Sequence, residues 1–495
     1  MLEAFWQGCV QVSDPLTFSL ICFGTIIGLI MGVIPGLTSI VSMALALPFI
    51  FGARAEVALP LMAAMATSSV TAGSMTAILL NIPGTPPNAA TLIDGFPMTQ
   101  KGEGARAVGA ALMSSCLGGV LGVLMALALI PMVVAFTMAF GTPELWALVL
   151  LGIAFIGILG AGSVTKGLMS GLLGILISLI GFQANTGASR FTFGTTFLYD
   201  GISLIPFTLG LFALPELIDL VQRKSVAQQL KLEKELKQDL MEGVKDTFRH
   251  FWLFFRSNVV GFIIGVIPGI GGDAAVFVAY GQAVRTSKRP ERFGTGIIEG
   301  VIAPEAANNA KEGGSLLCTV ALGLPGSAAM AVLLGGFIAV GLVPGPGMLT
   351  EHLDLSFNLF LTTVIGNIIG ATICFMLARY VIRIAYLSAD YMFPLVSVFV
   401  LVGAFAHHEE LLNIVVVFVV AILGYCMKKF GYSRPALLLG FILGYMFEKN
   451  LFISLEIYGA GFLIRPIVMV ILALVLLVST YDLMRAGFRR LFKQF

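Results

Sequence analysis

The chain has 495 residues, of which 58% are hydrophobic and 11% are charged, and its formal net charge is +2. An ordinary soluble domain carries about 25% charged residues, so this chain has too few polar side chains to cover a soluble globule. It also lacks a cluster of Lys and Arg interleaved with aromatic residues, and we therefore expect no nucleic-acid partner.

The apolar residues fall in runs close to the ~20 residues that cross a bilayer as an α-helix, and short stretches between the runs hold most of the charge. The run that starts at Leu172 does not alternate in polarity, as a β-barrel strand would. The six cysteines are scattered without a Cys-x-x-Cys pair, so no metal site, disulfide framework or cofactor is expected. The pattern predicts an all-α polytopic membrane protein with about 12 membrane segments.

The first interruption of an apolar run in chain order is the Pro35-Gly36 pair, which ends the segment Gly28-Leu-Ile-Met-Gly-Val-Ile-Pro-Gly36. Proline removes a helix hydrogen bond and the following glycine permits a non-helical backbone, so the helix should break at Pro35. We interpret this segment as the tip of a helical hairpin that enters the membrane and returns. The candidate ligands at this tip are Gly36, Thr38, Ser39 and Ser42.

A hydroxyl-rich stretch, Thr67 to Thr76, leads to the second interruption at Pro83, in Leu80-Asn-Ile-Pro-Gly-Thr85. We interpret it as an unwound transmembrane helix that meets the hairpin tip near the middle of the membrane. The candidate ligands here are Gly84, Thr85 and Asn88. For any one proline taken alone, a simple helix kink is the alternative.

Residues 222–256 form a polar insert in which eight Lys and Arg lie between Arg223 and Arg256. The positive-inside rule places this linker in the cytoplasm. The other basic stretches then alternate with non-basic loops if the N terminus is periplasmic and the C terminus is cytoplasmic. The expected location is the bacterial inner membrane.

Both interruptions recur in the same order after the linker. Gly261-Phe-Ile-Ile-Gly-Val-Ile-Pro-Gly269 matches the first hairpin segment at seven of nine positions, and Leu322-Gly-Leu-Pro-Gly-Ser327 matches the first break. Two ordered matches indicate an internal repeat. Helix breaks are therefore predicted at Pro268 and Pro325, with candidate ligands Gly269, Gly271, Gly272, Asp273, Gly326 and Ser327.

An unusually polar stretch, Gly296 to Gly314, lies between the second tip and the second break. One interpretation is a solvated connector at the membrane surface. The other is that Asn308 and Asn309, together with Glu305, face the binding cavity. The sequence leaves both open.

The two copies start on opposite sides of the membrane if the linker is cytoplasmic, which is the inverted-topology repeat of secondary transporters, with two helical hairpins and two broken transmembrane helices. The predicted units are 1–221, the first repeat; 222–256, the linker; 257–460, the second repeat; and 461–495, a C-terminal transmembrane helix with a cytoplasmic tail.

Neither the predicted tips nor the breaks contain Lys or Arg, so an anionic substrate would be held by backbone N–H groups at half-helix N-termini. Carboxylate and hydroxyl oxygens suit a cation instead, and we predict Na⁺ as the coupling ion, with proton coupling as the alternative. The predicted Na⁺ ligands are Ser42, Thr85, Asp273 and Ser327. A coupling ion is needed because each negative charge that enters against an inside-negative potential costs about 2.3 kcal/mol per 100 mV.

Four motifs resemble the large permease subunit of tripartite tricarboxylate transporters: Ile78-Leu-Leu-Asn-Ile-Pro-Gly-Thr-Pro86, Asp94-Gly-Phe-Pro-Met98, Gly300-Val-Ile-Ala-Pro-Glu-Ala-Ala-Asn-Asn-Ala310 and Leu322-Gly-Leu-Pro-Gly-Ser327. The resemblance extends from about Gly28 to Gly347 at the level of motifs. It implies a cation symporter that imports a carboxylate, such as citrate or a related organic anion, by alternating access. It also implies two partners: a small transmembrane subunit and a periplasmic solute-binding protein.

Two other classes of membrane protein are alternatives to a coupled transporter. An ion or solute channel is compatible with symmetric hairpins. An intramembrane enzyme is disfavoured because the sequence has no His-Glu-x-x-His, no Gly-x-Ser-x-Gly and no transmembrane aspartate pair. The oligomeric state is open, with a homodimer among the alternatives.

Overall fold

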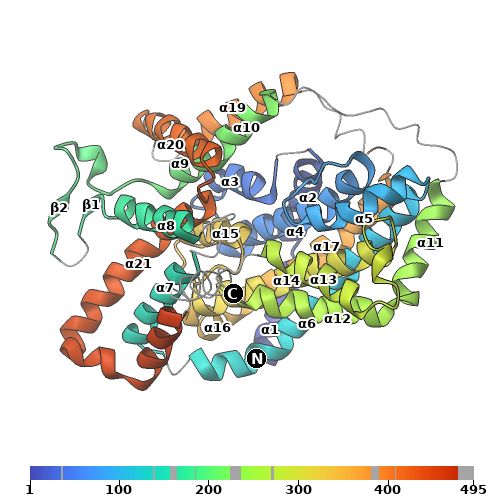
Figure 1. Ribbon diagram of the computed structural model, residues 1–495. Helices are drawn as coiled ribbons and strands as arrows, with labels where there is room; N and C mark the ends of the chain where they lie inside the picture. The colour runs from blue at the N-terminus through green and yellow to red at the C-terminus, as the bar shows by residue number, and fades with distance from the viewer. Residues whose placement is uncertain are drawn as a thin grey trace, which may run out of the picture.

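The computed structural model describes residues 1–34, 37–137, 140–156, 164–183, 186–222, 236–268, 272–378, 380, 389–406 and 409–477. Helices dominate this part of the chain (Figure 1), and one short antiparallel pair of strands, β1 (Gly181–Phe182) and β2 (Ser189–Arg190), sets Gly181 opposite Arg190. Up to the linker, the helices are α1 (Leu2–Ser13), α2 (Pro15–Val33), α3 (Ser39–Ile50), α4 (Ala55–Leu80), α5 (Asn88–Gln100), α6 (Gly104–Thr137), α7 (Thr142–Ile156), α8 (Val164–Ser178), η1 (Thr196–Leu198), α9 (Leu204–Thr208), the π-helical η2 (Leu209–Ala213) and α10 (Leu214–Gln222).

The rest of the chain is also helical. Its elements are α11 (Leu236–Arg249), α12 (Phe251–Val266), α13 (Gly272–Thr286), η3 (Pro290–Arg292), α14 (Glu299–Leu322), α15 (Ala328–Ala339), α16 (Pro346–Thr350), α17 (Leu353–Met376), α19 (Ala389–Ala406), α20 (Leu412–Lys429), α21 (Arg434–Tyr458) and η4 (Gly459–Ile464). A further apolar helix covers Pro466–Leu477.

Six helical stretches within the described residues are long and apolar enough to cross a membrane, namely Pro15–Val33, Ala55–Leu80, Gly104–Ala135, Leu353–Met376, Leu412–Lys429 and Arg434–Ile464. Shorter apolar helices, α3, α12 and α15 among them, add to these. The chain is therefore a multi-pass α-helical membrane protein, as predicted. The number of 12 segments and the inverted topology stay predictions.

The repeated sequence segments pack in the same way in both halves. Helix α2 lies along α4, and α12 lies along α14. The close approach depends on glycine: a Cβ added at Gly32 would lie 2.7 Å from the Cα of Ser69, and one added at Gly265 would lie 2.9 Å from the Cα of Lys311. Ser69 and Lys311 therefore occupy equivalent positions on α4 and α14.

The ends of these helices correspond as well. The residue after α2, Ile34, has φ −79° and ψ 114°, and Ile267 after α12 has φ −80° and ψ 114°. Helix α4 ends on Asn81 at φ 59° and α14 ends on Gly323 at φ 67°, both in the left-handed region. An asparagine tolerates this conformation better than most residues with a side chain, so the two different residues form the same C-cap.

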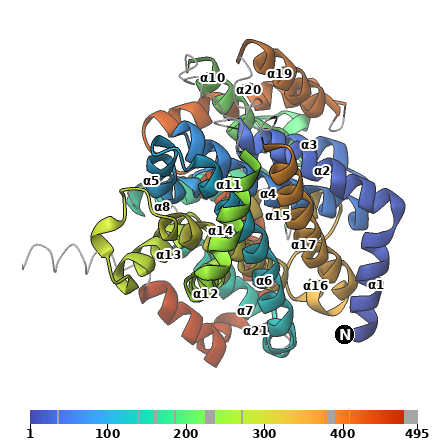
Figure 2. The ribbon, with the colours of Figure 1, turned by 90° about the vertical axis from the view of Figure 1, so that its right-hand side faces the viewer.

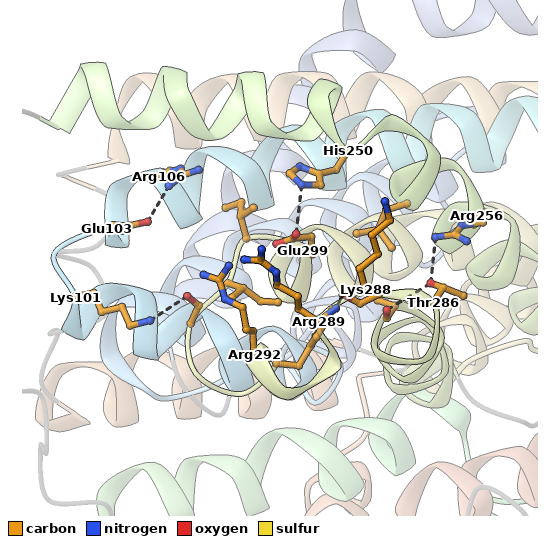
Figure 3. Close-up of a pocket in the computed structure, with 17 residues that line it drawn as sticks. Lys101, Glu103, Arg106, His250, Arg256, Thr286, Lys288, Arg289, Arg292 and Glu299 are labelled. Atoms are coloured by element: carbon orange, nitrogen blue, oxygen red, sulfur yellow. Dashed lines mark hydrogen bonds and ion pairs between the residues drawn. The ribbon is translucent and has the colours of Figure 1, made fainter.

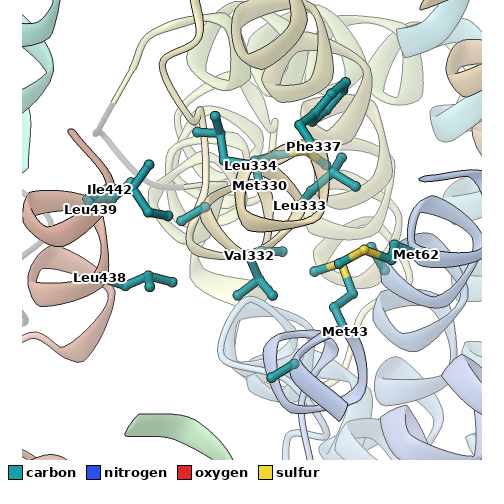
Figure 4. Close-up of a cluster of buried hydrophobic side chains, with 14 of the residues drawn as sticks. Met43, Met62, Met330, Val332, Leu333, Leu334, Phe337, Leu438, Leu439 and Ile442 are labelled. Carbon is teal, nitrogen blue, oxygen red and sulfur yellow. The ribbon is translucent and has the colours of Figure 1, made fainter. Parts of the chain in front are cut away.

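Each short helix after a break packs against the other half of the chain. Helix α5 contacts α13 and α14, whereas α15 contacts α3 and α4. Figure 4 shows Val332 and Leu333 of α15 near Met43 and Met62 on one side and α21 on the other. Burial of this apolar cluster joins the two halves at the centre of the molecule.

Part of the predicted linker is a helix packed on the bundle. Helix α11 runs along α6 (Figure 2), where Gly109 and Gly243 allow the two backbones to approach closely. Asp246 of α11 accepts from Arg106 Nε at 2.6 Å. Helix α12 begins at Phe251, within the predicted linker range.

Candidate polar site at the two helix breaks

Both predicted breaks between the paired helices are non-helical. Pro83 lies between α4, which ends at Leu80, and α5, which begins at Asn88. Pro325 lies between α14, which ends at Leu322, and α15, which begins at Ala328. The unwound segments bring polar groups into the protein interior.

The hairpin tips are described only in part. Pro35, Gly36, Gly269 and Gly271 lie outside the described residues, as does the side chain of Asp273. Pro268 lies two residues after Val266, the last residue of α12, and Gly272 begins α13.

At the first tip, the residues that follow the interruption are described. Thr38 is the N-cap of α3, and both Ser39 and Ser42 are buried. Ser42 Oγ donates to the carbonyl oxygen of Ser39 at 2.9 Å.

Asn88, the first residue of α5, holds the first break in place through its side chain. Its Oδ1 accepts hydrogen bonds from the N–H of Thr85, at 3.2 Å, and from the Thr85 hydroxyl. Its Nδ2 donates to the carbonyl oxygen of Val70 at 3.3 Å and to Glu305 Oε1 at 3.4 Å. The side chain therefore fixes the break to α4 and connects it to α14 of the other half.

Glu305 is fully buried and bound only by neutral donors. Its Oε2 accepts from the Ser115 hydroxyl at 2.6 Å, and its Oε1 accepts from Thr91 as well as from Asn88. These donors come from α5 and α6, so the carboxyl group lies where both halves of the chain meet. A buried carboxyl group among neutral donors is a typical candidate for taking up a cation or a proton.

The polar stretch after the second hairpin is a buried part of α14. Glu305, Asn308, Asn309, Lys311 and Glu312 are each at most 3% exposed. Lys311 Nζ donates to Glu312 Oε1 at 2.6 Å. Because these side chains are withdrawn from solvent, the solvated-connector interpretation does not hold for them. That Glu305, Asn308 and Asn309 face a binding cavity stays a prediction.

Asn309 connects three helices. Its Nδ2 donates to Thr71 Oγ1 on α4 at 2.9 Å and to Asn367 Oδ1 on α17 at 2.5 Å. Asn367 in turn donates to the carbonyl oxygen of Thr363 at 2.9 Å. The amide pair thus fixes α14 against α4 and α17.

Asn308 lacks hydrogen-bond partners in the described part of the chain. Both Nδ2 and Oδ1 are buried and unpaired, and Glu312 Oε2, one helical turn further along α14, is unpaired as well. A buried polar group without a partner costs about 1–3 kcal/mol, so such atoms usually meet water, an ion or a ligand. Asn308 and Glu312 are spaced i, i+4 and therefore share one face of α14.

The glycines of both breaks lie against backbone. A Cβ at Gly84 would lie 2.5 Å from the Cα of Gly73, and one at Gly326 would lie 2.6 Å from the Gly265 carbonyl oxygen. Ser327 caps α15, since its Oγ accepts from the N–H of Met330 at 3.3 Å. The predicted glycines therefore permit each break to pack against its own hairpin and broken helix.

Three side chains of this site were not predicted. Thr91, Ser115 and Asn367 bind Glu305 or Asn309, yet each is a single polar residue inside a helix. Nothing local in the sequence distinguishes them from other hydroxyl or amide residues of membrane helices. Only the packing of α5, α6 and α17 around α14 identifies them.

Asp94, quoted above only as part of a motif, fixes the loop that precedes α14. Its Oδ1 accepts from the N–H groups of Gly294, Gly296 and Ile297 at 2.9, 2.8 and 3.2 Å. Its Oδ2 accepts from the Tyr280 hydroxyl at 2.9 Å. Asp94 thereby holds the start of α14 against α5.

The fold and the site together define a polytopic α-helical membrane protein whose buried polar side chains gather at two broken helices. The model of the tripartite tricarboxylate transporter TctA family matches residues 18–439. The chain belongs to this family, which supplies the membrane component of tripartite transporters.

Two relatives from Agrobacterium vitis are similar to the chain. An uncharacterized 52.8 kDa protein in the TAR-I ttuC' 3' region is 32% identical over 431 residues, which are 87% of this chain and 85% of the relative. An uncharacterized protein in the TAR-II ttuC' 3' region is 33% identical over 191 residues, which are 39% of this chain and 79% of the relative. No solved structure gives a significant match.

Proposed function

We propose that this chain is the permease subunit of a cation symporter that imports a carboxylate, a tricarboxylate such as citrate or a related organic anion, through alternating access of a site between the two helix breaks. Membership of the tripartite tricarboxylate transporter family supports a substrate of this class. Beyond family membership, we propose where the substrate binds and what the buried polar residues do.

One observation carries the proposal. The first break, through Asn88, and the broken helix of the second half, through Glu305, share a hydrogen bond at the centre of the protein. The unpaired amide of Asn308 lies on α14 three residues from Glu305. Backbone freed by two helix breaks, together with an unpaired amide, supplies donors for a carboxylate without a cationic side chain.

Sodium is the proposed coupling ion, with Ser42, Thr85, Asp273 and Ser327 as its candidate ligands. The hydroxyls of Ser42 and Thr85 donate their protons to protein oxygens, and Ser327 Oγ accepts one N–H, so each hydroxyl oxygen keeps a lone pair with which it can bind an ion. Glu305 is compatible with Na⁺ coupling and with the alternative of proton coupling, because a carboxyl group buried among neutral donors can be neutralised by either ion.

The proposed assembly follows from the family. The chain would lie in the bacterial inner membrane with its N terminus in the periplasm. It would work with a small transmembrane subunit and a periplasmic solute-binding protein, and homodimerisation is compatible with the assembly. The binding protein would deliver the anion to the periplasmic side.

Uptake by proteoliposomes that contain the permease, the small subunit and the loaded binding protein tests the proposal. An inward Na⁺ gradient should drive accumulation of labelled citrate above its external concentration, whereas an inward proton gradient should do so if the alternative holds. Downhill flux alone, under either gradient, would remove the symport mechanism and favour a channel.

Two variants locate the site in the same assay. Asn308→Ala should raise the substrate concentration for half-maximal uptake, while Glu305→Gln, which keeps the shape of the side chain, should abolish the dependence on the ion gradient. Phe399→Leu on the exposed part of α19 provides a control that should transport normally. Normal uptake by both site variants would move the site away from α14.

A further inference from the structure

A cavity of about 650 Å³ lies outside the polar site, at the end of the molecule where α11 meets α12 (Figure 3). Three connections form its walls: the turn between α5 and α6, the corner between α11 and α12, and the loop between α13 and α14. Its volume falls within the ~300–1,000 Å³ that small-molecule sites commonly have. The polar and charged residues of its wall are Lys101, Glu103, Arg106, His250, Arg256, Thr286, Ser287, Lys288, Arg289, Arg292 and Glu299.

Cationic side chains predominate in this wall, with six Lys and Arg against two carboxylates. Among the described residues, Arg106 is the one Lys or Arg of this wall that has carboxylate partners at ion-pair distance, at 2.6 Å to Asp246 and 2.9 Å to Glu103. Arg256 donates to the neutral hydroxyl of Thr286 at 3.2 Å. Lys101 donates to the carbonyl oxygen of Gly296 at 3.4 Å.

The loop between α13 and α14 contributes the least compensated charges. Among the residues that the structure describes, Lys288 and Arg289 have no carboxylate within ion-pair distance. Arg292, on the same loop, is near Glu299, whose closest cationic partner is His250 at 3.4 Å. Figure 3 shows Arg289 and Arg292 on the loop between α13 and α14, and Arg106 on a separate helix.

We infer that this cavity binds a multivalent oxyanion, a ligand that carries at least two negative charges on phosphate or carboxylate groups. Several like charges around one hollow repel each other, and an anion that bridges them removes this repulsion. Arginine forks at Arg256, Arg289 and Arg292 match the paired oxygens of phosphate and carboxylate. A monovalent anion would leave most of the positive charge uncompensated.

An anion bound there would join parts of the chain that belong to different repeats. Lys101 belongs to the turn after α5 in the first half, whereas Arg256 lies on α12 and Lys288 follows α13, the two helices of the second hairpin. The bridge would hold this hairpin against the first half and so lower the rate of any motion between them. The cavity is separate from the proposed substrate site. An anion bound in the cavity would regulate transport and would not itself be transported.

Binding to the purified full-length chain in a neutral detergent tests the inference. Inorganic pyrophosphate, titrated by calorimetry, represents a free anion, and phosphatidylglycerol, compared with phosphatidylcholine in nanodiscs, represents a lipid headgroup. Binding of pyrophosphate identifies a soluble source, whereas binding of phosphatidylglycerol alone identifies the membrane. In either case the dissociation constant should rise steeply with salt.

The double variant Lys288→Gln/Arg289→Gln should weaken binding of the anion at least about tenfold, since each lost charge-assisted hydrogen bond contributes about 1.5–3 kcal/mol. The matched control is Arg285→Gln, which removes one exposed cation from α13 outside the cavity wall and should change binding less than about twofold. Both variants alter exposed residues, so their elution and thermal unfolding should match the unmodified protein.

Two results would overturn the inference. One is the absence of binding for both pyrophosphate and phosphatidylglycerol at millimolar concentration. The other is equal affinity in the double variant and the Arg285→Gln control, which would show that the bound anion responds only to the general charge of this face.

Discussion

The two broken helices, α4 and α14, share a backbone arrangement but differ in their side chains. Each follows a helix that packs on it through glycine, and each ends on a left-handed residue before its break. The buried polar residues of α4 are uncharged, whereas α14 buries Glu305, Lys311 and Glu312. Backbone geometry can thus be repeated while the buried charge is concentrated in one copy.

The largest effect is expected where α4 and α14 differ in charge at equivalent positions, Ser69 and Lys311. Lys311→Ser gives α14 the residue that α4 has at Ser69, and it leaves the buried Glu312 carboxylate without its partner. Loss of one member of a buried ion pair commonly costs about 3–5 kcal/mol. The midpoint of thermal unfolding in detergent should fall clearly.

The double variant Lys311→Ser/Glu312→Val is the control, because it introduces both residues of the first copy, Ser69 and Val70. It should recover most of the loss, since no unpaired charge is left. If the single variant unfolded at the temperature of the unmodified protein, the ion pair would not stabilise α14.

The next effect tests what the copies share. Gly326→Ala and Gly84→Ala each place a methyl group against backbone atoms that cannot move aside, within 2.6 Å of Gly265 O and 2.5 Å of Gly73 Cα respectively. Overpacking of this kind costs about 1–3 kcal/mol or more, so both variants should lower the unfolding midpoint by similar amounts.

Gly281→Ala on α13, where nothing lies within 4 Å of the added methyl group, should not lower the midpoint and should raise it slightly, because alanine has the higher helix propensity. A large difference between the Gly84 and Gly326 variants would mean that the two breaks are not packed equivalently.

A smaller effect concerns the amide on α14 and its counterpart on α4. Asn309→Ala removes donors to Thr71 and Asn367 and should cost about 1–3 kcal/mol of unfolding free energy. Thr67→Ala, at the equivalent position, leaves intact the bond that the Thr67 carbonyl oxygen accepts from Thr71. Its cost should stay below about 1 kcal/mol. Equal losses in parallel unfolding measurements would contradict the assigned asymmetry.

The smallest expected effect concerns the first residues of α4 and α14, where ion pairs should contribute differently to the unfolding midpoint as the pH changes. His250 lies 3.4 Å from Glu299 at the start of α14, and the hydrogen bond to Glu299 raises the pKa of His250 above its ordinary value of about 6.5. This stabilisation is complete below the unfolded pKa and is lost as the pH rises through the folded pKa. The difference in unfolding midpoint between the unmodified protein and His250→Gln should therefore shrink from pH 6 to pH 8.5, a range over which we expect Glu299 to stay ionised.

The start of α4 has an ion pair that contains no histidine. Arg54 lies 3.5 Å from Glu56 and is 81% exposed, so Arg54→Gln should produce a small difference that is constant over the same pH range. A difference for His250→Gln that does not change with pH would show that the histidine is neutral in the folded protein.

Sequence alone was sufficient to assign this chain to the α-helical membrane proteins and to locate the breaks in its helices. Apolar runs of membrane length predicted a multi-pass α-helical protein, and the Pro-Gly pairs at Pro83 and Pro325 fall in segments that are not helical. Both inferences depend on local chemistry: a proline disrupts its own helix, and an apolar run avoids water wherever it is. The family was also readable, because its motifs lie in continuous stretches of chain.

Which polar residues share a site depends on how the helices pack in three dimensions. Glu305 binds Asn88, Thr91 and Ser115, which precede it by 217, 214 and 190 residues. The burial of Lys311 and Glu312 was equally undecided, since a helix with that polarity is compatible with the membrane surface until its neighbours are placed. Hydrogen bonds and burial depend on atoms brought together from distant parts of the chain, and a linear sequence carries no direct record of those distances.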